Sequence, residues 1–269
     1  MTVAADLRVS DRGPARLRRI SLGRWASPIV LLLLWELGSR TGVIPTRILA
    51  APSSVAATFW SMTLSGELPS NLLVSLARAG VGLVIGVVLG SAFALAAGLS
   101  KRGELAVDPP LQMLRTLPAL ALSPLLIVWL GIGEAAKIAL IAYATTFPIY
   151  LNLYNGVRGV DVRLVEAARS FGLSDLAVIR HVILPGALPS FLVGLRYALS
   201  VSVLILVAAE QINAQAGLGY LINNARDFMR TDILVVCLLV YALLGLAADF
   251  IVRTLERQAL AWRPSLVER

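Results

Sequence analysis

The sequence contains few of the residues from which cross-links, metal sites and active sites are built. Of its 269 residues, one is a cysteine, one is a histidine and 15% are charged. A single thiol, Cys237, cannot form a disulfide within the chain, and its place in an apolar run predicts a packing role. The lone histidine, His181, has no second ligand near it in the sequence, so we expect it to face solvent or an interface and to bind no metal.

Motifs of catalysis and of nucleotide binding are missing as well. The chain has no H-E-x-x-H, no G-x-S-x-G and no clustered acidic motif, so a membrane enzyme would lack its reactive groups. It also has no G-x-x-x-x-G-K-[ST] phosphate loop. We therefore predict that the chain is not an enzyme and holds no cofactor of its own.

Apolar residues are abundant instead, at 58% of the chain. Stretches of about 20 apolar residues recur along most of the sequence, which excludes disorder and a water-soluble core. They predict an all-α polytopic membrane protein. The net charge of +8 would suggest nucleic-acid binding in a soluble chain, but the positive-inside rule accounts for it here, and we expect no nucleic-acid partner.

Six transmembrane helices are predicted from these stretches. They cover residues 25–38, 72–99, 111–130, 135–154, 186–209 and 233–252. Pro118 and Pro124 interrupt the third span, and the short connection to the fourth predicts a tight antiparallel hairpin. The spacing of Gly82, Gly86 and Gly90 places all three near one face of the second span, which predicts close packing against another helix.

The first span is short, and a basic segment before a short apolar run is also typical of a signal peptide. Its clean apolar centre covers residues 29–34 and continues through Trp35 and Glu36 into Ser39 and Arg40 without a small-residue cleavage pattern. We therefore interpret it as a transmembrane span, since a helix extended back toward Ile20 would be long enough to cross the bilayer.

The distribution of basic residues predicts the orientation of the chain in the membrane. Six spans place both termini on one side, and a cytoplasmic position for them puts 17 of the 24 Lys and Arg residues inside and five outside. The predicted organisation is a cytoplasmic basic tail over residues 1–24, a transmembrane domain over residues 25–252 and a cytoplasmic tail over residues 253–269.

The longest cytoplasmic connection, residues 160–189, is predicted to form two short amphipathic helices. Gly172 can adopt a positive φ where the first helix ends, and Ser174 is placed to cap the second. Pro185 and Pro189 are expected to end that second helix and to begin the next span. An interfacial helix that lies on the lipid is an equally good interpretation of this pattern alone.

A motif in this connection resembles the EAA loop of ABC importer permeases. The family pattern is EAA, three residues, Gly, nine residues, Ile, one residue and Leu-Pro, and the chain has it as Glu166-Ala167-Ala168, Gly172 and Val182-Ile183-Leu184-Pro185. The one departure is Val182 in place of Ile. Further segments resemble permeases of the nitrate, sulfonate and taurine type, with an aliphatic-sulfonate-like member the best match: residues 115–118, 123–124, 129–137, 216–222, 255–257 and 261–263.

This resemblance implies a type I ABC importer permease in the bacterial inner membrane. It implies a homodimer that works with two cytoplasmic ATPase subunits, which bind ATP and Mg²⁺, and with an external solute-binding protein. The residues implied in coupling to the ATPase are Glu166, Ala167, Ala168, Gly172, Leu184 and Pro185. The implied solute is small and anionic, such as a sulfonate, taurine or nitrate, although bicarbonate and heterocyclic vitamin precursors fit the same family.

Three charged residues are candidates for the translocation pathway or a gate: Arg78, Arg196 and Glu210. Because a charge within a bilayer is costly, both arginines should face protein or water. Arg78 could also extend toward the outer surface, and either arginine could pair with Glu210 or Asp249. Glu210 begins the outer segment, residues 211–232, where a turn and a short helix are expected near an external gate.

The remaining acidic residues near these spans, Glu104, Asp108 and Glu134, are interpreted as solvated loop charges. An alternative function is a secondary transporter or channel that works without an ATPase. Such a protein would show repeated halves with broken helices, and we find no internal repeat in the sequence.

Overall fold

The computed structural model describes residues 22–260, and every regular element in that range is helical. In chain order the elements are α1 (Leu22–Arg40), α2 (Pro52–Leu64), α3 (Glu67–Leu99), α4 (Lys101–Leu114), η1 (Ala119–Leu122), α5 (Ser123–Leu130), α6 (Glu134–Arg158), α7 (Val162–Ser170), α8 (Asp175–Val178), η2 (Ile179–Ile183), α9 (Leu184–Asn213), α10 (Leu218–Asp227) and α11 (Thr231–Ala259). Residues 1–21 of the predicted basic tail and residues 261–269 lie outside the described residues.

Four helices within residues 22–260 are long and apolar enough to cross a membrane: α3, α6, the continuous helix Asp175–Ile212 and α11. The bent pair formed by α4 and Ala119–Leu130 is either a fifth, broken span or a re-entrant loop. At 1.5 Å per residue, even the 25 residues of α6 extend about 37 Å. The prediction of an all-α polytopic membrane protein is confirmed, while the count of six spans stays a prediction because α1 is not among these helices.

The third span differs from the prediction of a helix over residues 111–130. The helix α4 already begins at Lys101, capped by the Ser100 hydroxyl, which accepts a hydrogen bond from the Gly103 amide at 2.9 Å. The chain then bends by 87° before the segment Ala119–Leu130. Pro118 explains the break, since it disfavours helical geometry in the residue before it. Residues 101–114, expected to be partly a loop, are therefore helical.

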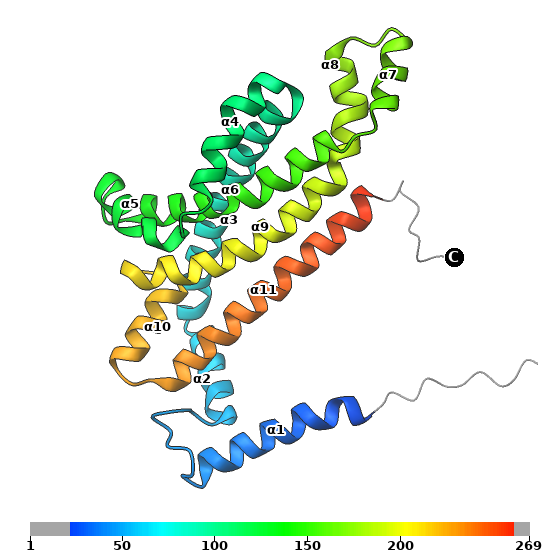
Figure 1. Ribbon diagram of the computed structural model, residues 1–269. Helices are drawn as coiled ribbons and strands as arrows, with labels where there is room; N and C mark the ends of the chain where they lie inside the picture. Colours follow the sequence, from blue (N-terminus) through cyan, green and yellow to red (C-terminus); the bar gives the residue numbers. More distant parts are fainter. Residues whose placement is uncertain (1–21, 261–269) are drawn as a thin grey trace, which may run out of the picture.

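The glycines of α3 allow α6 to approach closely, as predicted. A Cβ atom built on Gly82 would lie 2.7 Å from Cβ of Ile141, and one built on Gly90 would lie 2.6 Å from the carbonyl oxygen of Thr146. Because no other residue fits at these distances, the two helices pack along the whole glycine face. This pair forms the centre of the bundle (Figure 1).

The buried core is divided along the bundle. One cluster lies toward α10 and includes Ile141, Leu206 and Cys237, while the other lies toward the opposite end and includes Tyr150. Cys237 is fully buried and unpaired, which confirms its predicted packing role.

The helix α1 stands apart from the other long helices (Figure 1). It contacts α2, a helix that the sequence did not predict, and each apolar side chain from residue 29 to 34 is more than half exposed. At the junction, Glu36 accepts hydrogen bonds from the backbone amide and the hydroxyl of Ser53, and pairs with Arg40 at 2.5 Å. This carboxylate satisfies an amide at the start of α2, so the junction has a defined geometry.

Candidate functional site

The connection predicted to be cytoplasmic, residues 160–189, extends beyond the end of the bundle (Figure 1). Asp161 caps α7, since its carboxylate accepts from the Arg163 amide at 2.9 Å. The chain then reverses at Gly172, whose φ is +83°, and Ser174 accepts from the Ala177 amide at 3.4 Å to begin α8. The predicted pair of helices, the break at Gly172 and the Ser174 cap are all confirmed.

The predicted end of the second helix at Pro185 is wrong. The helix continues from α8 through the wide turn η2 into α9 without interruption. In that wide turn the Leu184 amide donates to the carbonyl of Ile179, five residues earlier. Pro185 lies in the first turn of α9, directly after this wide turn, so the continuous helix accommodates the proline. The connection is therefore joined rigidly to the span that follows.

The tip of this connection carries exposed apolar side chains. Phe171 and Leu176 are 85% and 76% exposed, and no other part of the bundle within residues 22–260 covers them. Among the predicted coupling residues, Glu166 is exposed and Ala168 is buried between the two helices. Exposed apolar groups at such a tip fit contact with a protein or with the membrane surface. Phe171 was not singled out from the sequence, because a lone aromatic next to a glycine gives no pattern.

The exposed side chain of His181 extends along the same helix. Its Nδ1 atom lies 2.9 Å from the carbonyl oxygen of Ala177. No group of three or more His, Cys, Asp or Glu side chains in residues 22–260 could hold a metal ion.

Arg78 lies in a buried cluster of charges at the other end of the bundle. Its side chain is 4% exposed, its Nη1 atom lies 2.6 Å from Oε1 of Glu210, and its Nη2 atom lies 2.7 Å from Oε1 of Glu134. The interpretation that Arg78 extends to the surface is therefore wrong. Glu134 is not a free loop charge either, because it also accepts from Lys137 at 3.2 Å. Two cations and two carboxylates balance, so the cluster carries no net charge.

Glu210 is fully buried and joins several helices. Besides Arg78, it accepts hydrogen bonds from Ser75 at 2.7 Å, from the Gly219 amide at 2.9 Å and from the Tyr241 hydroxyl at 2.9 Å. These donors belong to α3, α10 and α11, while Glu210 belongs to α9. The turn and short helix predicted after Glu210 are confirmed, with Gly217 at a φ of +104° before α10.

Arg196 is placed away from this cluster. Of its two predicted partners it meets Asp249, with Nε 3.2 Å from Oδ1, and it does not meet Glu210. A second carboxylate, Glu256, lies 4.0 Å away. Arg196 therefore joins α9 to α11 in an ion pair that is about one-third exposed.

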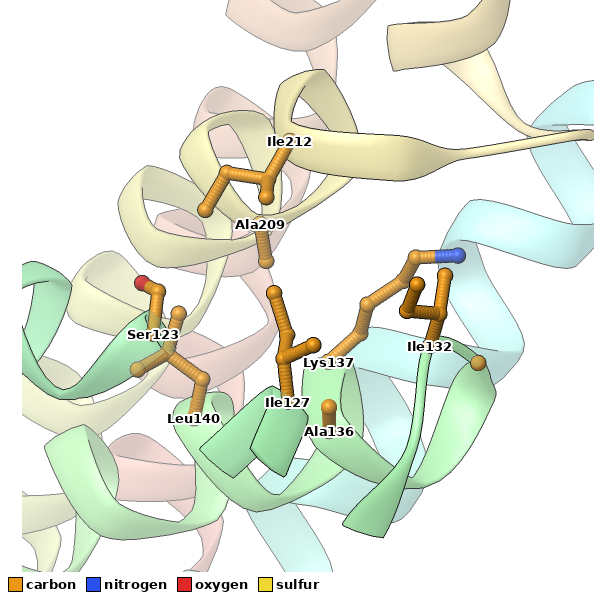
Figure 2. Close-up of a pocket in the computed structure, with 9 residues that line it drawn as sticks. Ser123, Ile127, Ile132, Ala136, Lys137, Leu140, Ala209 and Ile212 are labelled. Atoms are coloured by element: carbon orange, nitrogen blue, oxygen red, sulfur yellow. The ribbon is translucent and has the colours of Figure 1, made fainter. Parts of the chain in front are cut away.

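A small cavity lies between α5, the start of α6 and the end of α9 (Figure 2). Ile127, Ala209 and Ile212 point toward one another across it, whereas the amine of Lys137 lies at its edge. Its volume is about 30 Å³, enough for one or two water molecules. Solute pockets usually measure about 300–1,000 Å³, so this cavity does not hold a solute in the present conformation.

A larger apolar groove follows from the bend of the third span. It has a volume of about 640 Å³ and opens to the surroundings between α3, α4, α5 and α6. Leu111, Leu126 and Tyr143 are among the residues that line it.

The helical spans, the projecting connection and the buried charge cluster together define a polytopic membrane protein with a helical connection that extends outside its bundle. Residues 82–260 match the family described as "Binding-protein-dependent transport system inner membrane component". The chain belongs to this family and is the permease subunit of an ABC importer.

Relatives of known name support this assignment over most of the chain. SsuC of Escherichia coli strain K12, named as an aliphatic sulfonates transport permease protein, is 47% identical over 252 residues, which cover 94% of this chain and 96% of SsuC. TauC of the same strain, named as a taurine transport system permease protein, is 34% identical and covers 90% and 89%. These relatives are transport permeases and not enzymes.

Solved structures share the fold. A crystal structure of an amino acid ABC transporter with histidines superposes with a TM-score of 0.60 at 21% identity, over 74% of this chain and 98% of that one. An inward-facing structure of the MetNI methionine ABC transporter gives a TM-score of 0.56 at 21% identity, over 71% and 97%.

Proposed function

We propose that the chain carries aliphatic sulfonates into the cytoplasm as the permease of a type I importer. The observation that carries this proposal is the 47% identity to SsuC over 94% of the chain. A second SsuC, from Bacillus subtilis strain 168, is 43% identical over 88% of the chain. The more distant TauC makes taurine, itself a sulfonate by its chemistry, the second solute to test.

ATP and Mg²⁺ are bound, in this proposal, by separate ATPase subunits into which the coupling segment, residues 160–189, docks. Two observations support this. The tip of the segment exposes Phe171 and Leu176, and the helix from α8 to α9 continues without a hinge. A rigid connection can transmit a movement of the ATPase to the span, which a flexible loop cannot. Within the segment we assign the contact to Glu166, Ala167, Ala168 and Gly172, and the attachment to the span to Leu184 and Pro185.

The solute path runs, we propose, between two copies of the chain. The cavity of about 30 Å³ inside one chain supports this, because it is too small for a sulfonate. The open groove of about 640 Å³ offers each copy an apolar surface on which the other can pack. At the outer end, a solute-binding protein delivers the solute, and the cluster of Arg78 and Glu210 belongs to the gate. Arg196 is the candidate for the inner part of the path.

Both termini are cytoplasmic in this arrangement, and α1 is the first of six spans. Its 19 residues extend about 28 Å, close to the thickness of a bilayer core of about 30 Å. With α1 as the first span, we divide the chain into a tail over residues 1–24, a membrane domain over residues 25–252 and a second tail from residue 253.

Transport by the reconstituted complex tests the proposal. Proteoliposomes that contain the permease, its ATPase and its binding protein should accumulate an alkanesulfonate in preference to nitrate, and only with ATP inside the compartment that holds the ATPase. Accumulation without ATP would favour the alternative of a secondary transporter. Equal uptake of nitrate and no uptake of sulfonates would overturn the solute assignment.

Gly172 provides a matched pair of variants for the coupling segment. A Cβ atom on Gly172 meets nothing within 4 Å, so the cost of a substitution comes from the backbone φ of +83° alone. Gly172→Val should release the ATPase during purification, because β-branched residues resist positive φ, whereas Gly172→Asn should retain it, because asparagine tolerates this region. Equal retention by both variants, with unchanged solute-stimulated hydrolysis, would contradict the docking role.

A further inference from the structure

A row of polar contacts connects α4 to α6 at the cytoplasmic half of the bundle. The Tyr150 hydroxyl donates to Oδ1 of Asp108 at 2.6 Å, and the Tyr154 hydroxyl donates to Oε1 of Glu104 at 2.7 Å. Arg158 pairs with the other oxygen of Glu104. We call these five residues the α4–α6 cluster. The structure thus corrects the interpretation of Glu104 and Asp108 as solvated loop charges.

The cluster is ordered by helix geometry. Tyr150, Tyr154 and Arg158 follow one another at intervals of four residues, so they share one face of α6, and Glu104 and Asp108 share a face of α4 in the same way. The two tyrosine rings stack with centroids 5.8 Å apart, and the Arg158 guanidinium lies 5.9 Å from the centre of the Tyr154 ring. Each side chain therefore holds its neighbour in place.

Few apolar contacts compete with the cluster for holding α4. Leu111 is the one buried residue of this helix, and it belongs to the same core cluster as Tyr150 and Leu153 of α6, with Val107 packed against it. The side of α4 that packs on a neighbour lies against α3, whereas α6 is reached through the long side chains of the cluster. At the far end of α4, the Tyr143 hydroxyl adds a bond of 2.5 Å to the carbonyl oxygen of Leu114. Polar bonds therefore add to a small apolar contact in holding α4 to α6.

The position of the cluster connects two functional parts of the chain. Arg158 is the last residue of α6, and the coupling segment begins two residues later. The helix α4 leads through the bend of 87° to α5, whose Ser123 and Ile127 line the cavity of Figure 2. A movement of the coupling segment that displaces the end of α6 therefore reaches α5 through these contacts.

We propose that the α4–α6 cluster transmits movement of the coupling segment to the bent third span, with Glu104 and Tyr154 as its positioning residues. This inference rests on the proposed function, because it needs an ATPase docked on that segment. In the cluster, α4 moves with α6, and α5 moves with α4, so the wall of the cavity is displaced when the ATPase closes. Weakening the cluster separates hydrolysis from transport without affecting either docking or nucleotide chemistry.

The test measures ATP hydrolysed per solute transported in proteoliposomes that contain the complete complex. Tyr154→Phe removes one hydroxyl and keeps the ring stack, and Glu104→Gln removes the charge. The matched control is Tyr197→Phe, because Tyr197 is 58% exposed on α9 and its hydroxyl makes no hydrogen bond among the described residues. We expect both cluster variants to retain the ATPase and to raise the ratio by about two- to thirtyfold, the range that single residues along a coupled network produce. The control should keep the wild-type ratio.

A charge exchange separates transmission from simple stability. Glu104→Arg combined with Arg158→Glu restores the ion pair in reverse, and the ratio should return toward the wild-type value. An unchanged ratio in both single variants overturns the proposal, as does a lower thermal midpoint with normal coupling. Failure of the proposed function gives a different result: the wild-type chain itself neither retains the ATPase nor transports solute. That result overturns both the proposed function and this inference.

Discussion

Gly86 allows α3 and α6 to lie closer together than any larger residue would permit. A Cβ atom built on it would lie 2.0 Å from Oγ1 of Thr145 and 2.8 Å from the carbonyl oxygen of Ala142. The second atom belongs to the backbone and cannot rotate away. Gly86→Ala should therefore force the two helices apart. Gly80 lies on the same helix, and a Cβ atom there meets nothing within 4 Å, so Gly80→Ala is the matched control.

The size of the effect follows from packing. Overfilling a packed site costs about 1–3 kcal/mol. The higher helix propensity of alanine contributes about 0.5–1 kcal/mol in the opposite direction, equally in both variants. The difference in free energy of unfolding between Gly86→Ala and Gly80→Ala is therefore the packing cost alone, about 1–3 kcal/mol. For a chain of this size, that corresponds to a difference of about 2 to 12 °C in Tm.

The assay uses the buried thiol of the chain as a reporter. Cys237 is fully buried, so a thiol-reactive fluorophore labels it in detergent only as the bundle opens. Both variants and the wild type are heated in the same micelles, and the midpoint of labelling is recorded. If Gly80→Ala and Gly86→Ala unfold at the same temperature, the glycine face does not set the distance between α3 and α6.

Three further predictions concern charge and burial. Arg78→Gln leaves Glu210 buried without its cation and should lower the free energy of unfolding by about 3–5 kcal/mol. Arg40→Gln breaks an exposed pair and should lower it by less than about 1 kcal/mol. Similar losses in Tm for the two variants would contradict the burial argument. Arg196→Gln should reduce sulfonate uptake with wild-type folding if this residue lines the path, and unchanged uptake removes it from the path. Cys237 should stay unlabelled by maleimide in the folded chain and react within minutes after denaturation, and rapid labelling of folded protein would show that it is accessible.

The long spans could be predicted because apolar length is a property of the chain itself. The helices α3, α6, α9 and α11 each cover a predicted span, with ends that differ by several residues. The helix α2 was missed, since its 13 residues mix serine and threonine with apolar residues and are too short to span. The helix α4 was missed because Lys101, Glu104 and Asp108 have the polarity of a loop. The partners of Glu104 and Asp108 lie on α6, 50 and 42 residues further along the chain, where no local pattern reveals them.

The candidate sites show the same division between local and distant signals. Gly172 and Ser174 were predicted correctly, because a cap depends on the few residues around it. Glu210 was one of two carboxylates considered as a partner of Arg78, but the sequence could not select it over Asp249, since Glu210 is 132 residues away. Pro185 misled the prediction for a further reason. A wide turn before Pro185 relieves the steric clash by which a proline normally ends a helix. The hydropathy of the sequence does not indicate such a turn.

The charge cluster around Glu210 constrains how the helices at that end of the bundle can separate. Glu210 accepts hydrogen bonds from Ser75, Arg78, Tyr241 and the Gly219 amide, which together come from three helices besides its own. Removing one partner from a buried charge costs several kcal/mol, because the carboxylate is left without compensation and without water. Partial separation of these helices is therefore unfavourable at every step. An intermediate in which only some of these hydrogen bonds are broken is poorly populated. We expect this end of the bundle to exist in two states, one with the cluster intact and one in which water replaces all of its contacts at once.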